Sequence, residues 1–398
     1  MATVTLNNAE QALKSVYLGV VSDQLNANTN PLYARIEKTT EDVWGKDVRK
    51  TAPIGINGGF SAGTETGSLP QANGNRYVQF VSTLKNLYGQ IEISDKAVRA
   101  SSNSAGAMVN LLNAELEGLL KASKFNLARM LFGDGTGKLA QIDKTTVAAN
   151  AVNAAYYDAN LKDNKLYNLI EGMTVDFANA SNGNILGQAR IHSINRQTGT
   201  VTFTDICSLS TDPVLYVQDS RGNELTGLES IFNPAITTLY GLNKAEHSWL
   251  NPTSLALGTA DLECKMQELI DKSVELYNSD IDMIVCSAGV KRAYMKHMSA
   301  YKRNIDIMNI EGGYKAMSFN GIPLVSDRFC SSGKMYFLNT KDFKLHQLCD
   351  WKWLEGDNGR ILKQIAGKAV YSATLVKYAE LICDKPCGQA SLTGIAEQ

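Results

Sequence analysis

Four stretches of the chain repeat apolar residues every three or four positions, which is the spacing of one face of an α-helix. The longest begins after a cap at Ser102 or Asn103 and ends at Gly133. At 1.5 Å per residue, a helix of roughly thirty residues would be ~45 Å long. The sequence therefore predicts one dominant helix and three shorter ones, at residues 6–25, 259–277 with a cap at Thr259, and 288–301.

Residues 77–85 alternate in the manner of a β-strand, and they follow a segment of unusual composition. Residues 53–76 hold six Gly in 24 positions and cannot build a core of their own. We expect a long two-stranded ribbon with a flexible tip. Because such a ribbon is marginal alone, it would pack on its own domain or on a neighbouring molecule. A disordered surface loop is the alternative.

Residues 145–222 change character, because short strands replace long apolar stripes. Strand patterns occur at 172–178, 189–195, 200–206 and 213–219, and Arg-Gln-Thr-Gly joins the second and third as a hairpin turn. We expect a small antiparallel β-barrel or sandwich inserted into the main fold. An apolar strand at 282–287 and a strand-rich segment after Tyr314 complete an α+β fold, because the chain shows no sustained βαβα alternation.

The length and the composition of the chain add two expectations, on the number of packed regions and on self-association. A chain of 398 residues and 43.3 kDa is expected to form two or three packed regions. Only 20% of the residues are charged, and Asn is as abundant as Gly at 32 each. The 39 basic and 40 acidic residues give a net charge of −1, which disfavours a dedicated nucleic-acid binder and favours self-association.

Candidate chemistry is sparse. The seven Cys are too scattered for a disulfide framework, which indicates a reducing cytoplasm, and no apolar run is long enough to span a bilayer. Cys383 and Cys387 lack a second ligand pair, so we expect buried small side chains rather than a metal site. The four His lie in separate segments, and HExxH and GxSxG motifs are missing. We therefore predict no catalytic residue, no cofactor and no metal.

Three further features have two interpretations each. Gly133–Gly137 (GDGTG) could be a phosphate loop, but it follows a helix, so a helix end and turn is favoured. The basic stretch 291–303 could touch DNA, but a solvated helix face or half of an intersubunit ion-pair network is more common. Trp351 and Trp353 alternate on a strand and are expected to anchor a core or an interface rather than to form a ligand platform.

The order of these parts resembles the major capsid proteins of tailed bacteriophages, with their Hong Kong 97-like fold. Individual sequence segments fit as well. The segment STLKNLYGQIEISDKAVRAS resembles the outgoing strand of the family's E-loop, and LFGDGTGK resembles the end of its spine helix. SFNGIPLVSDRFCSSGKMYFLNTKDFKLHQL resembles its late strands, and KYAELICDKPCGQASLTGI its closing segment. The resemblance covers about 1–142 and 223–398, and residues 143–222 are similar to the inserted domain of some members.

The resemblance implies a domain plan. It consists of an N-terminal arm (1–50), an E-loop (51–93), the spine helix and start of the P-domain (94–142), the inserted β-rich domain (143–222), the P-domain return (223–258), and the A-domain with closing P-domain strands (259–398).

The resemblance also implies a non-enzymatic subunit of an icosahedral phage head. Hexamers and pentamers would enclose double-stranded DNA without sequence-specific contact, with a portal protein and a separate scaffolding protein as partners and no membrane. The subunit would be made in the host cytoplasm and reside in the virion capsid. Some members cross-link through an E-loop Lys, but this sequence has no Lys between Lys50 and Lys85. The alternative is an encapsulin-like bacterial nanocompartment shell that holds cargo enzymes, against which the extended arm argues.

Candidate assembly contacts follow from the same resemblance, because arms and E-loops lie over neighbouring subunits. They are Arg35, Trp44, Gly58, Gly59, Glu65, Arg76, Lys85 and Arg99.

Overall fold

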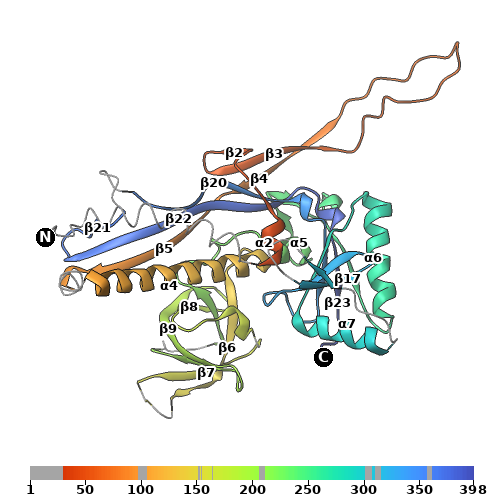
Figure 1. Cartoon of the computed structure of the whole chain (residues 1–398). Helices are drawn as coiled ribbons and strands as arrows, with labels where there is room; N and C mark the ends of the chain where they lie inside the picture. The colour runs from red at the N-terminus through yellow and green to blue at the C-terminus, as the bar shows by residue number, and fades with distance from the viewer. Residues whose placement is uncertain are drawn as a thin grey trace.

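The computed structural model describes residues 30–96, 105–150, 153, 155–163, 165–205, 211–300, 307–309, 315–355 and 361–398. The predicted helix at 6–25 lies outside these residues. A long sheet runs above the long helix α4, and a β-barrel hangs below that helix (Figure 1). A second sheet with helices α6 and α7 lies at the other end, and a narrow ribbon projects away from the body (Figure 1). The fold is mixed α and β, as the sequence predicts.

Helix α4 spans Ala105–Phe132, 28 residues, and confirms the predicted dominant helix, whose proposed cap at Ser102 or Asn103 lies outside the described residues. Its apolar stripe is buried at Leu116, Leu120 and Leu127. Strand β5 (Lys85–Ser94) crosses it closely, because a Cβ added to Gly89 would meet Leu119 at 2.7 Å. The missing side chain at Gly89 lets the sheet lie directly on the helix.

The long sheet has the order β1-β20-β22-β21, and β5 also pairs with β22. Strand β22 is the centre, because it pairs antiparallel with both β5 and β20. Both Trp residues of β20 are buried, so the prediction of core anchors is confirmed. The strands are β1 (Glu37–Thr39), β20 (Phe343–Trp353), β21 (Lys363–Gln364) and β22 (Val370–Cys383), and the short helix α2 (Pro31–Arg35) precedes β1.

The ribbon consists of β3 (Asp47–Ile54) and β4 (Arg76–Thr83), paired antiparallel without a register break, with β2 (Val43–Trp44) beside β3. Its root is fixed by Phe80, which is fully buried. The Phe80 ring meets Tyr240 and Trp249 edge-on, at centroid distances of 5.8 and 5.5 Å. The predicted two-stranded excursion is therefore confirmed.

The β-rich segment forms a closed barrel with the order β10-β7-β6-β11-β8-β9. Leu139, Phe177, Phe203 and Leu215 fill its interior. Its first strand begins at Lys138, five residues before the expected boundary at 143. The strands are β6 (Lys138–Ala149), β7 (Tyr157–Leu161), β8 (Thr174–Asn179), β9 (Ile185–Asn195), β10 (Thr200–Phe203) and β11 (Pro213–Val217).

The second sheet has the order β14-β23-β19-β15-β18-β17-β16 and packs against α6 (Leu262–Tyr277) and α7 (Ala288–Ala300). The cap of α6 is Asp261, whose carboxylate accepts from the Cys264 amide, so the prediction of Thr259 was wrong by two residues. Other elements are α5 (Leu228–Phe232), β12 (Thr238–Leu239), β13 (Leu242–Asn243), β14 (Thr253–Ala256), β15 (Met283–Cys286), β16 (Ile307–Asn309), β17 (Lys315–Phe319), β18 (Ile322–Ser326), β19 (Met335–Leu338) and β23 (Ala390–Thr393).

The barrel joins the body where α4 ends. Residues 133–137 form a turn, with Gly135 and Gly137 at positive φ, which confirms a helix end rather than a phosphate loop. The Arg129 guanidinium donates to both carboxylate oxygens of Glu224, at 2.5 and 2.8 Å, and this pair is buried. Just beyond the barrel, Gly227 lies against the last carbonyls of α4. The connection that enters the barrel and the connection that leaves it are thus held together at the end of α4.

Candidate assembly surfaces

The tip of the ribbon, residues 55–75, presents large apolar side chains to solvent. Ile56, Phe60 and Leu69 are 91–93% exposed. Glu65 is the only charged residue in the tip. Burying one such side chain stabilises a protein by about 1.5–3 kcal/mol relative to leaving it in solvent. The isolated chain does not gain this free energy at the tip. The tip is therefore the strongest candidate for a surface that contacts another molecule.

Three of the candidate residues, Gly58, Gly59 and Glu65, lie in the tip, and Arg76 directly follows it. Gly58 and Gly59 face the returning half of the loop, and a Cβ at Gly58 would meet the Asn73 amide at 2.9 Å. Glu65 and Arg76 are exposed, and Arg76 begins β4 opposite Ile54. The sequence-based selection missed the apolar tip residues. The signal was available, because an Ile, a Phe and a Leu in a Gly-rich segment have no core of their own to enter.

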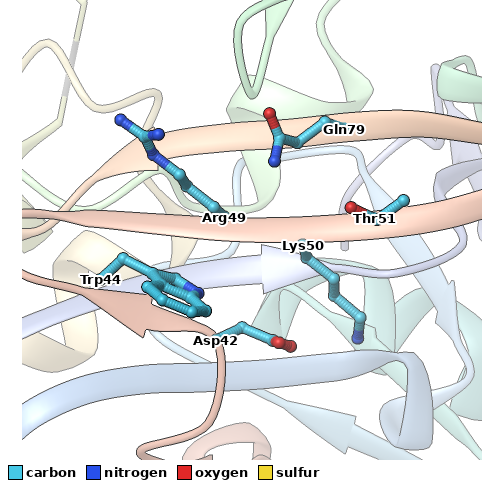
Figure 2. A pocket seen from close by; sticks show the side chains of 6 residues that line it. All are labelled: Asp42, Trp44, Arg49, Lys50, Thr51 and Gln79. Carbon is cyan, nitrogen blue, oxygen red and sulfur yellow. The ribbon is translucent and has the colours of Figure 1, made fainter.

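An open groove of about 510 Å³ lies beside the base of the ribbon. Trp44, Asp42 and Lys50 lie on one side of β3, and Gln79 lies on the neighbouring strand β4 (Figure 2). Trp44 is 69% exposed, and a large exposed aromatic at the wall of a groove is typical of an interface anchor. The groove is lined by Asp42, Trp44, Arg49, Lys50, Thr51 and Gln79.

Two of the candidate residues are used inside the chain. Arg35 donates from Nη1 to the carbonyl oxygen of Asp282 at 2.9 Å, so it fastens the arm to the second sheet. Lys85 is half-buried and donates weakly, at 3.4 Å, to the carbonyl of Gly222. Each side chain therefore contacts a segment of its own subunit: Arg35 contacts the residue that precedes β15, and Lys85 contacts the segment after the barrel. Arg99 lies outside the described residues.

The candidate chemical sites behave as structural groups. Cys383 and Cys387 are buried, and burial raises the pKa of both thiols, as expected of small side chains in a core. Within the described ranges, no cluster of His, Cys, Asp and Glu has the arrangement of a metal site. In the same part of the chain, no helix is long and apolar enough to cross a membrane.

The basic face of α7 is partly engaged within the subunit. Arg292 donates to the Gln398 carbonyl at 2.5 Å, and Lys296 donates to the Gln398 side chain at 2.8 Å. His297 lies 3.6 Å from a carboxylate oxygen of Asp261. Within α7 these contacts favour the interpretation of a helix face over that of a DNA-binding surface, since groups bonded to the chain are less available to phosphates. Residues 301–303 of the predicted basic stretch lie outside the described residues.

Comparison with known proteins finds likeness in structure only. No protein-family model matches the chain, and no curated protein matches it. The capsid asymmetric unit of cyanophage A-1(L) superimposes with a TM-score of 0.52 at 11% identity, covering 94% of this chain and 92% of that one. The capsid of the native GTA particle gives a TM-score of 0.48 at 11% identity, covering 92% and 91%. The holo-SrpI encapsulin complex of Synechococcus elongatus PCC 7942 gives 0.46 at 10% identity, covering 92% and 88%.

Proposed function

We propose that this chain, which has the Hong Kong 97-like fold of tailed-phage capsid proteins, is a major capsid protein that self-assembles into an icosahedral head. The observation that carries the proposal is likeness to a cyanophage capsid subunit over 94% of the chain. The ribbon supports it independently. A slender hairpin with a nearly uncharged, apolar tip suits a subunit that completes its packing only beside copies of itself.

In the proposed shell, hexamers and pentamers form from this subunit, and the ribbon acts as the E-loop. Its tip would lie over a neighbour, where Ile56, Phe60 and Leu69 lose their exposure. Trp44 and the groove beside it would contribute a second contact. The barrel would be a domain inserted between the spine helix and the P-domain return, away from the sheet that carries the ribbon (Figure 1).

The proposed role is structural, not enzymatic. The head would enclose double-stranded DNA without sequence-specific contact, in keeping with a net charge of −1. A portal protein and a separate scaffolding protein are the other partners we propose. The subunit would be made in the host cytoplasm and would need no cofactor and no membrane. Lysine-mediated cross-linking of the tip is not expected, because the tip holds no Lys.

Electron microscopy of the purified full-length chain, with and without co-expressed scaffolding protein, tests the proposal. Capsomers or closed shells are the expected result. A chain that stays monomeric or dimeric in both preparations contradicts the proposal. Nuclease-protected DNA inside particles isolated from an infected or induced host supports a phage head. Particles that hold cargo enzymes and no DNA would instead support the encapsulin-like alternative.

A further inference from the structure

The most exposed large apolar side chains of the described residues lie at the two ends of the ribbon. Ile56, Phe60 and Leu69 at the tip are 91–93% exposed, and Trp44 beside the base is 69% exposed. Large apolar side chains gathered in solvent mark places where another molecule binds. The tip lacks an apolar surface to enter, and the groove at the base has an exposed aromatic wall. The two ends of the ribbon are therefore complementary in kind.

The strand register places the groove on the outer face of the ribbon base. Thr51 is directly opposite Gln79. Trp44 is opposite the residue that lies two positions before Arg49. Opposite residues share a face of a sheet, as do residues two apart on one strand, so these four side chains lie on one face (Figure 2). Phe80 projects to the other face, where it is buried in the body. The groove is thus open to another molecule.

The tip of a chain cannot enter the groove of that same chain. Strands β3 and β4 are paired at every position from the root to the tip. At about 3.3 Å per residue, the four steps from Thr51 to Gly55 already place the start of the tip ~13 Å from the groove. The ribbon then continues away from the body (Figure 1). Because turning the tip back would break the pairing, any tip in the groove comes from another copy.

The tip and the groove also carry charges of opposite sign. Glu65 is the only charged residue of the tip and is exposed. Arg49 is 53% exposed, and its contact with a neighbouring carboxylate is 3.4 Å long, well beyond a strong charge-assisted hydrogen bond. Lys50, the other cation that lines the groove, is held by Asp384 at 2.5 Å. Asp42 lies on the side of Lys50 rather than of Arg49 (Figure 2). The Arg49 guanidinium is therefore the cation best placed to bind a carboxylate from outside.

We propose that the groove beside Trp44 binds the ribbon tip of a second copy of this chain, with Glu65 of one copy paired with Arg49 of the other. The inference rests on the proposed function and names the partner of both assembly surfaces. A groove of about 510 Å³ has room for a few side chains of the tip. Because tip and groove are different surfaces, each copy gives its tip to one neighbour and receives a tip from the other. Such head-to-tail contacts close into rings, as hexamers and pentamers require.

Reversal of the two charges tests the pairing. Arg49→Glu and Glu65→Arg each place like charges at every contact of a ring, so each should lower the yield of capsomers or shells at least about tenfold. The double variant has opposite charges again, and its yield should lie within about threefold of wild type. Both side chains are exposed, so the unfolding temperatures of the unassembled variants should match that of wild type.

An equal mixture of the two single variants distinguishes a contact between copies from an effect within one copy. In a hexamer that alternates the variants, every tip meets a groove of opposite charge, so the mixture should recover assembly. Normal assembly of the single variants overturns the inference. Failure of the mixture or of the double variant to recover also overturns it, while wild-type shells in the same experiment still support the proposed function. A wild-type chain that forms neither capsomers nor shells contradicts the proposed function and this inference with it.

Discussion

At the scale of single residues, the Arg129 and Glu224 pair shows how burial changes the role of a charge. Their side chains are only 5% and 2% exposed, and the two hydrogen bonds are bidentate. A buried pair adds little compared with well-packed apolar groups, because desolvation offsets the attraction. Its value here is positional, since Arg129 ends the long helix and Glu224 follows the barrel. Losing one partner leaves an uncompensated buried charge.

We predict that Arg129→Met destabilises the unassembled chain by about 3–5 kcal/mol, because it leaves the Glu224 carboxylate buried without its cation. Arg49→Met is the matched control. Its side chain is 53% exposed and its contact with Asp47 is 3.4 Å long, so its loss should cost at most about 1 kcal/mol. Urea unfolding midpoints of the two variants measure the difference. Equal midpoints would show that the Arg129 pair is not structurally important.

At the scale of elements, two Gly residues decide how closely segments approach. Gly89 lets β5 lie on α4, and Gly227 lets the segment after the barrel lie on the end of the same helix. A Cβ at Gly227 would lie 2.3 Å from the carbonyl oxygen of Met130 and 2.7 Å from that of Gly133. Both obstacles are backbone atoms, so the helix end itself would have to move.

Gly227→Ala should therefore destabilise the fold by more than about 1 kcal/mol, whereas Gly118→Ala should stabilise it by roughly 0.5–1 kcal/mol. Gly118 lies within α4, is exposed, and has no atom within 4 Å of an added Cβ, so only helix propensity changes. Thermal unfolding of the unassembled variants measures both effects. Stabilisation by both substitutions would contradict the close approach of Gly227 to α4.

At the scale of the whole molecule, the body and the root of the ribbon are packed, but the tip of the ribbon is not. The cores of the two sheets and of the barrel bury their apolar residues within the subunit, while the tip buries none of its large ones. We therefore expect stability and assembly to be separable in the proposed shell. Stability would depend on the body, and assembly on the ribbon and on the groove beside Trp44.

Replacing Ile56, Phe60 and Leu69 together with Ser should leave the unfolding temperature of the subunit within about 2 °C of wild type, since no packed atom changes. The same variant should lose most of its shell formation, because the burial of these side chains against a neighbour no longer contributes. Ile185→Ser is the control, as this barrel residue is 52% exposed and lies away from the ribbon. Light scattering during assembly measures the effect, and normal assembly of the triple variant would exclude the tip as a contact.

The sequence by itself determined the local elements of this protein. Helical spacing predicted the long helix, alternation predicted the ribbon and the barrel strands, and the Gly-rich composition of residues 53–76 predicted which segment lacks a core. These features depend on neighbours along the chain, which periodicity records. Two candidate residues, Arg35 and Lys85, also have partners inside the chain that no pattern could reveal, because Asp282 and Gly222 are more than a hundred residues away.

Only the tertiary structure decided the rest. It joined Arg129 to Glu224, placed the barrel under α4, and set Trp44 on the same face of the ribbon base as Gln79. It also showed that Ile56, Phe60 and Leu69 remain in solvent. Pairing across a sheet depends on register, and exposure depends on what folds over a residue. Both are properties of segments distant in sequence that meet only when the whole chain packs.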